Sequence, residues 1–103
     1  MILSLPTLSS LEGLILDLLA DEELFGLQLV ERSAGRLKRG TVYVTLARMQ
    51  EKGYVESRTE PLPAGGIGLP RRMYRPTAFG LRVLDASLQA ARAFAERMAR
   101  DAG

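Results

Sequence analysis

The stretch Arg39–Gly53, which reads RGTVYVTLARMQEKG, decides how the rest of the chain is interpreted. Its apolar residues recur at intervals of four and three and form an inward stripe: Val42, Leu46 and Met49. This spacing predicts a helix over residues 40–52. Gly53 then ends the helix, because glycine readily adopts the left-handed conformation of a helix cap.

The start of this helix has an unusual composition. Tyr43 and the two threonines, Thr41 and Thr45, are weaker helix formers than alanine, leucine or glutamate, and Gly40 and the positively charged Arg39 stand just upstream. The side opposite the apolar stripe presents four residues, with Tyr43 at its border: Thr41, Thr45, Arg48 and Lys52. We therefore expect that contact with a partner molecule, and not helix stability, explains the choice of residues at this helix start.

Two shorter helices are predicted upstream. Ser9 followed by Glu12 has the spacing of a capping box, and the leucine-rich helix behind it reaches about Leu19. A second helix is expected over residues 25–34, with Gly35 as its stop. Its predicted buried side consists of Leu27, Val30 and Ala34.

A β-hairpin and a long helix are predicted downstream. Residues 54–59 and 71–76 have the character of short strands, and the segment 61–70, rich in Pro and Gly, connects them. Thr77 is expected to cap a final helix that continues to near the end of the chain.

The final helix carries two apolar stripes. One is a heptad seam of six residues: Leu81, Leu84, Leu88, Ala91, Ala95 and Met98. The other consists of Val83, Ala90 and Phe94. Because a surface helix needs one apolar face, we expect one stripe to pack on its own domain and the other on a partner. The alternative is a helix wrapped by its own chain, but too little sequence remains to cover about 35 Å of helix.

Charge is unevenly distributed along the 103 residues. Residues 1–35 hold one basic and six acidic side chains, whereas residues 36–75 hold nine basic and three acidic ones. The central segment is therefore expected to meet a polyanion, although a solvated basic face explains the same asymmetry.

The chain contains neither His nor Cys. The usual zinc ligands, thiol nucleophiles and the side chain best suited to proton transfer are therefore missing, and we expect neither enzymatic activity nor a metal or cofactor. The lack of cysteine suits a reducing cytoplasm. No apolar run is long enough to cross a bilayer, and the opening MILSLP lacks a basic leader, so neither a membrane anchor nor a secretory signal is predicted.

Three short motifs give the chain a family resemblance. They are Gly40-Thr41-x-Tyr43-x-x-Leu46, Glu51-x-Gly53 and Tyr74-Arg75-x-Thr77-x-x-Gly80. Together with the leucine-rich first helix, they make residues 11–84 similar to the PadR family of bacterial transcriptional regulators. Val44 departs from the family pattern, in which proline often follows the motif tyrosine.

This resemblance implies a mainly α fold with a small β-hairpin, namely a winged helix-turn-helix followed by a long C-terminal dimerisation helix. Residues 1–76 would form the N-terminal segment and the DNA-binding domain, and residues 77–103 the dimerisation helix. The implied function is that of a homodimeric repressor in the bacterial cytoplasm, which binds double-stranded DNA at an inverted repeat. We expect the heptad seam and the N-terminal MILSL residues to form the dimer interface.

The implied helix-turn-helix fold, together with the chemistry of the exposed residues, leads to a hypothesis about which residues contact DNA. The helix that enters the major groove would supply seven of them: Arg39, Gly40, Thr41, Tyr43, Thr45, Arg48 and Lys52. The wing would supply Arg71 and Arg72 for phosphate contacts. Arg48 is the candidate for base selection, since arginine bonds bidentately to guanine. Tyr43 is either a phosphate contact or a half-buried core aromatic, and Tyr74 is expected in the core.

Two other functions fit the same residues. A winged-helix interaction module would use the basic face to bind an acidic protein partner. A ligand-responsive regulator would bind a small molecule at the dimer interface, but the chain has no Trp and no evident aromatic pair to form such a pocket. Enzymatic activity fits least, because neither a phosphate-binding loop nor a metal-ligand cluster is evident.

Overall fold

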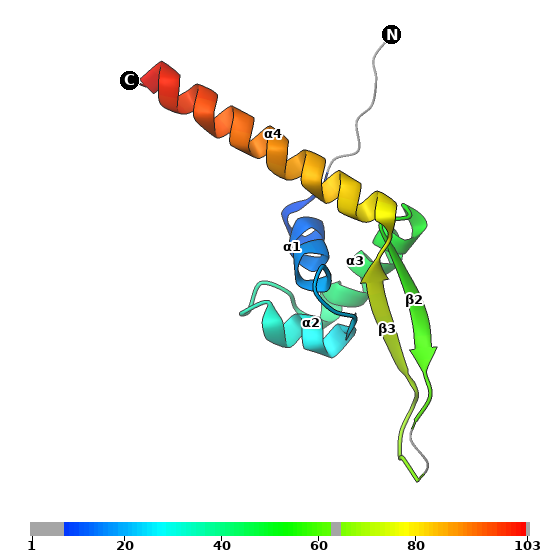
Figure 1. Cartoon of the computed structure of the whole chain (residues 1–103). Coiled ribbons are helices and arrows are strands. Elements are labelled where there is room, and N and C mark those ends of the chain that lie inside the picture. The colour runs from blue at the N-terminus through cyan, green and yellow to red at the C-terminus, as the bar shows by residue number, and fades with distance from the viewer. Residues whose placement is uncertain (1–7, 63–64, 103) are drawn as a thin grey trace.

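A computed structural model describes residues 8–62 and 65–102 of the chain. In these residues four helices and three strands follow one another along the chain: α1 (Ser10–Leu19), β1 (Leu24–Phe25), α2 (Gly26–Arg32), α3 (Arg39–Glu51), β2 (Val55–Glu60), β3 (Arg71–Pro76) and α4 (Ala78–Ala102). Figure 1 labels each of them except the short β1. The mainly α fold with a β-hairpin and a long final helix is thereby confirmed. The expected interface residues at the N-terminus, MILSL, lie outside the described part.

The predicted capping box of α1 is confirmed. The Ser9 hydroxyl accepts a hydrogen bond from the Glu12 amide at 3.1 Å, and the Ser9 amide donates to Glu12 Oε1 at 2.9 Å. These bonds satisfy two of the amide groups that a helix start leaves free. Ile15, Leu16 and Leu19 lie on the buried side of the helix.

Glu12 also ties α1 to α3. Its second carboxylate oxygen, Oε2, accepts a hydrogen bond from Lys52 Nζ at 2.8 Å, although the two residues are 40 positions apart. Glu12 is buried, and Lys52 is about half exposed. One carboxylate therefore caps the first helix and holds the end of the third.

The prediction for α2 was wrong in its end and in its buried side. The helix ends at Arg32, and its buried residues are Gly26 and Leu29, while Leu27 and Val30 are half-buried. Ala34 is exposed and has a φ of 53°. Ser33 causes the early end, since its hydroxyl donates to the Val30 carbonyl and accepts from the Leu37 amide, which turns the chain away from the helical path.

The hairpin is part of a three-stranded antiparallel sheet with the order β1-β3-β2. Tyr74 in the central strand pairs with Ser57 of β2 on one side and with Leu24 of β1 on the other. The two residues of β1 were not predicted, because so short a strand shows no alternation of polar and apolar side chains. β3 has the predicted bounds, and the buried position of Tyr74 confirms its predicted place in the core.

The core lies between α1, α2, α3 and the inner side of the sheet. All three residues of the predicted inward stripe of α3 are fully buried: Val42, Leu46 and Met49. Gly53 has a φ of 80°, and the Tyr54 amide bonds to the Met49 carbonyl at 2.8 Å. This arrangement is a Schellman cap, so the predicted end of α3 at this glycine is confirmed.

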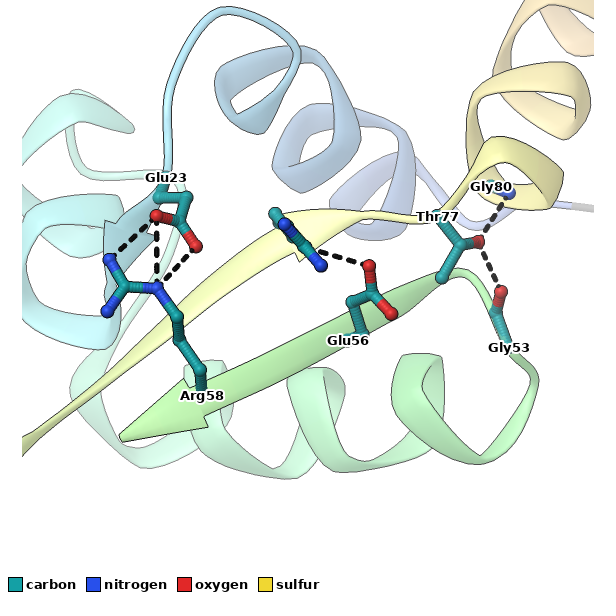
Figure 2. A network of polar contacts seen from close by, with 7 residues as sticks. Glu23, Gly53, Glu56, Arg58, Thr77 and Gly80 are labelled. Carbon is teal, nitrogen blue, oxygen red and sulfur yellow. Dashed lines mark hydrogen bonds and ion pairs between the residues drawn. The ribbon is translucent and has the colours of Figure 1, made fainter. Parts of the chain in front are cut away.

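Thr77 joins the start of α4 to the end of α3 (Figure 2). Its hydroxyl donates to the Gly53 carbonyl at 2.5 Å and accepts from the Gly80 amide at 2.9 Å. The Thr77 amide also donates to the Tyr54 carbonyl at 3.0 Å. The predicted helix cap is confirmed, and it binds two elements at once.

Gly80 completes this joint because its backbone lies directly against that of Tyr54. A Cβ atom added to Gly80 would overlap the Tyr54 carbonyl oxygen and lie 2.9 Å from the carbonyl carbon. A backbone group cannot rotate out of the way as a flexible side chain can. Glycine is therefore required here by the close approach of two chain segments.

We expect Gly80→Ala to lower the free energy of unfolding by about 3 kcal/mol, since the added methyl group forces α4 away from Tyr54. Gly13→Ala in α1 is the matched control, because a Cβ there meets no atom within 4 Å. That control should leave stability unchanged or raise it by up to about 1 kcal/mol. Urea denaturation of both variants checks the prediction, and equal stabilities would contradict it.

The bond between Glu12 and Lys52 predicts a pH-dependent term in stability. Burial raises the pKa of Glu12, but the hydrogen bonds from Lys52 and the Ser9 amide outweigh it, and the pKa lies below its ordinary value of 4.5. A carboxylate with a depressed folded-state pKa stabilises the protein above its unfolded pKa, and this contribution disappears as the pH falls through the folded pKa.

Glu12→Gln isolates this term, since the amide oxygen can still cap α1 while the charge facing Lys52 is removed. We expect a loss of about 1 kcal/mol in the free energy of unfolding at neutral pH, because Lys52 is half exposed. Urea titrations between about pH 3 and pH 7 should show the two proteins converging as the pH falls through the depressed folded-state pKa of Glu12. A difference that grows on acidification would refute this explanation.

Candidate nucleic-acid interface

The outward face of α3 is a continuous exposed surface on the side opposite the core stripe. Counting about 100° per residue from that stripe, the outward positions are Gly40, Thr41, Val44, Ala47, Arg48 and, at the C-terminal end, the acidic Glu51, all exposed. We call the first five of these residues, Gly40 to Arg48, the reading face. Val44 and Ala47 were missed in the sequence, although the same count from the apolar stripe would have found them.

The predicted interface residues of α3 do not all lie on this face. Gly40, Thr41 and Arg48 do, and Arg39 is exposed just before them. Thr45 is only half exposed and lies at the edge toward α1. Lys52 follows the last helical residue, with its ammonium group on Glu12.

The threonine hydroxyls of α3 donate to the helix itself. Thr41 Oγ1 bonds to the Lys38 carbonyl at 3.1 Å, and Thr45 Oγ1 bonds to the Thr41 carbonyl at 2.8 Å. Each hydroxyl proton is therefore occupied, and a ligand meets oxygen lone pairs and methyl groups. The two threonines cannot donate to a phosphate without breaking these bonds.

The N-terminal end of α3 is open to an anion. Lys38 occupies the cap position but provides no side-chain hydrogen bond, so the first amides of the helix are not capped by a side chain. A Cβ added to Gly40 would meet no atom of the protein within 4 Å. The positive helix end and the lack of a side chain at position 40 together permit a close approach by phosphate or a groove edge.

Tyr43 lies between the reading face and the wing, and it has features of both predicted roles. Its side chain is 51% exposed, yet its ring covers Gly26 so closely that a Cβ there would lie 2.5 Å from the ring atom Cε1. Glycine at the start of α2 therefore makes room for the ring. The tyrosine packs by its ring while part of its side chain stays in solvent.

The hairpin extends beyond the helices as a wing (Figure 1), and its arginines divide into two pairs. Near the helices, Arg58 makes three hydrogen bonds of 2.8–3.2 Å to the Glu23 carboxylate, and Arg75 donates to Glu56 at 2.7 Å. Figure 2 shows Arg58 reaching across to Glu23. Arg58 and Arg75 are therefore engaged by carboxylates of the protein itself, and these bonds stabilise the sheet.

The other pair, Arg71 and Arg72, begins β3 on the side of the wing tip. The Arg71 guanidinium lies over the Phe25 ring at 4.6 Å from its centre. Arg72 donates to the Ser57 hydroxyl at 3.0 Å. Both side chains are held in place by neutral groups, so their positive charge remains available to a ligand.

Some charged side chains form ion pairs within the protein, and others remain unpaired on its surface. Glu12, Glu22 and Glu23, three of the six carboxylates in residues 1–35, pair with Lys52, Arg32 and Arg58. Within residues 8–62 and 65–102, five cations near the reading face and the wing are in no ion pair: Lys38, Arg39, Arg48, Arg71 and Arg72. These five cations outnumber the exposed carboxylates of α3 and the tip side of the wing, Glu51 and Glu60, so the surface between α3 and the wing is positive on balance.

Most of α4 lies outside the core. Val83 is buried and Leu84 packs partly against the core, but every residue from Asp85 to Ala102 is exposed. Figure 1 shows this part of the helix extending away from the other elements. Of the heptad seam, Leu81, Leu88 and Met98 are exposed by 41%, 54% and 51%, and both alanines are exposed.

The apolar residues of α4 that meet the core and those that meet solvent lie on one side of the helix. Steps of four and three residues connect Gly80, Leu84, Ser87, Ala91, Phe94 and Met98. The domain covers the beginning of this side and leaves the rest open. The two stripes predicted from the sequence thus border a single broad face.

None of the helices in the described ranges is both long enough and apolar enough to cross a membrane. Within the same ranges, no group of three or more His, Cys, Asp or Glu side chains is placed so that it could hold a metal ion.

Comparisons with known proteins agree with this architecture. No match was found among curated proteins. Among solved structures, a PadR family transcription regulator from Clostridium difficile R20291 is 26% identical, with a TM-score of 0.76 over 92% of this chain and 100% of that chain. A PadR family transcriptional regulator from Eggerthella lenta is also 26% identical, with a TM-score of 0.74 over 88% of this chain and 80% of its own.

The sequence comparison adds a match to a whole family. The model of the transcriptional regulator PadR-like family matches residues 15–86, from the middle of α1 into α4. The matched region contains the reading face, the wing and the joint at Thr77, so the resemblance seen in the three motifs is confirmed. The chain belongs to the PadR-like family of transcriptional regulators.

Proposed function

We propose that this chain is a homodimeric repressor that binds an inverted-repeat operator in double-stranded DNA in the cytoplasm. The observation that carries the proposal is the exposed reading face of α3, located beside cations that form no ion pair with a carboxylate of the described residues. Family membership supports a role in transcription regulation.

In this proposal α3 enters the major groove with its N-terminal end leading. Gly40 lets the backbone approach the DNA, and Thr41 and Val44 follow on the same side. Arg48, one turn further on, reaches a base edge and bonds bidentately to guanine. Thr45 lies at the edge of this contact, and we assign Lys52 mainly to the bond with Glu12.

The wing contributes affinity and register. Arg71 and Arg72 bind backbone phosphates beside the groove that α3 occupies, as does Arg39 at the helix start. The Tyr43 hydroxyl lies between these two sets of cations and donates to a phosphate. Phosphate contacts of this kind release counterions from DNA, so the affinity depends steeply on salt.

The exposed face of α4 forms the dimer. Leu81, Leu84, Leu88, Ala91, Ala95 and Met98, with Phe94 beside them, pack against the same residues of a second copy. Residues 77–103 thus act as the dimerisation helix and residues 1–76 as the DNA-binding unit. Twofold pairing presents two copies of α3 to successive major grooves, about 34 Å apart on one face of the duplex.

Arg48 and the wing pair should differ in what they contribute. We expect Arg48→Ala to lose about 1–3 kcal/mol of discrimination between operator and scrambled duplex, because it reads a base. Arg71→Gln with Arg72→Gln should weaken both duplexes alike and flatten the salt dependence by about 0.9 for each lost phosphate contact. The probe is a duplex from the region upstream of the protein's own gene, located by footprinting and measured by fluorescence anisotropy.

An unchanged ratio of affinities in Arg48→Ala would remove its role in base selection. An unaltered salt slope in the double variant would remove the wing from the interface. Failure to bind any duplex at low salt would refute the proposed function and favour a protein partner.

The dimer is tested by two alanines on opposite sides of α4. Ala95→Glu places a charge in the apolar face and should yield a monomer of 11.3 kDa where the unaltered chain has twice that mass. Ala93→Glu adds the same charge on the other side and should leave the dimer intact. Light scattering at micromolar concentration distinguishes the two. A monomeric unaltered chain, or equal behaviour of the variants, would contradict the assigned interface.

A further inference from the structure

Val44 occupies the most outward position of the reading face, opposite the buried stripe of α3. Its side chain is 52% exposed. Valine is a poorer helix former than alanine because its branched Cβ loses rotamer freedom in a helix. Neither helix stability nor core packing therefore accounts for an apolar branched residue at this position.

The neighbours of Val44 make this part of the reading face apolar. Thr41 has committed its hydroxyl proton to the Lys38 carbonyl. Ala47 presents only a methyl group. From Gly40 to Ala47 the reading face thus offers methyl groups and acceptor lone pairs but no side-chain hydrogen-bond donor, and the first such donor is Arg48.

A groove edge that suits this surface must itself be apolar. In the major groove of DNA, thymine alone among the four bases carries a methyl group, at C5. We infer that Val44 is a specificity-determining residue that packs against a thymine methyl. This inference rests on the proposed DNA binding by α3 and names one base that α3 selects.

The position of that thymine relative to the base read by Arg48 follows from helix geometry. Val44 and Arg48 are four residues apart, which is about 6 Å along the helix axis. Base pairs follow one another every 3.4 Å or so along the duplex. The thymine and the guanine should therefore lie one or two base steps apart in each half-site.

The test uses deoxyuridine, which pairs like thymidine but lacks the methyl group. A duplex is first enriched by the full-length protein from a random-sequence pool, and each thymine is then replaced singly. We expect one thymine per half-site at which the replacement weakens binding about fourfold, the value of one buried methyl group. Replacement in both half-sites should multiply the two losses.

Variants assign the effect to its side chain. Val44→Ala, which loses both γ-methyl groups, should bind the thymine and uracil duplexes equally at that position, while Val44→Thr, which keeps one γ-methyl group, should retain part of the preference. Arg48→Ala is the comparison variant: its overall affinity should fall, but its thymine-to-uracil ratio should match that of the unaltered protein. Because Val44 is on the surface, thermal melting should show all three variants folded.

Each outcome decides the question. If no thymine is sensitive to loss of its methyl, or if Val44→Ala keeps the full preference, the inference is wrong while the proposed function stands. If the protein enriches no duplex at all, both fail together.

Discussion

The arrangement of the whole molecule depends on the bonds that Thr77 makes between the end of α3 and the start of α4. One hydroxyl donates to Gly53 and accepts from Gly80, and the absence of a side chain at Gly80 brings the two backbones into contact. The helix proposed to read DNA and the helix proposed to form the dimer are thus joined through a few bonds and not through a flexible linker. In the proposed dimer, the separation of the two reading faces would depend on this joint.

The charged side chains fall into two groups, those paired within the protein and those left unpaired on its surface. Acidic residues early in the chain are used internally, where Glu12 holds Lys52 and Glu23 holds Arg58. This internal pairing leaves an excess of cations on α3 and the outer part of the wing, where Glu51 and Glu60 are the exposed carboxylates of the described residues. The net charge of +2 therefore understates the positive potential of the proposed interface. The ion pairs of Lys52, Arg58 and Arg75 also mean that fewer basic residues are unpaired than a count along the sequence suggests.

Much of the fold could be predicted from the sequence because its signals are local. Caps at Ser9, Gly53 and Thr77 need only neighbouring residues, and a stripe spaced by three and four defines the buried side of α3. The end of α2 could not be predicted, because it depends on hydrogen bonds of the Ser33 side chain. The candidate site was recovered in part: the sequence indicated the helix, but its most outward residue, Val44, was taken as a departure from a motif. The engagement of Lys52 by Glu12 depends on a contact 40 residues away, which no local pattern contains.

The contact between Gly26 and Tyr43 couples two positions that belong to different helices. The tyrosine ring fills the space that any side chain at position 26 would need. A larger residue at 26 is thus compatible with this backbone only if position 43 becomes smaller or the ring swings outward. The two sites should accordingly vary together among relatives, and a designer who wishes to retune the proposed interface at position 43 gains room to do so by changing position 26 at the same time.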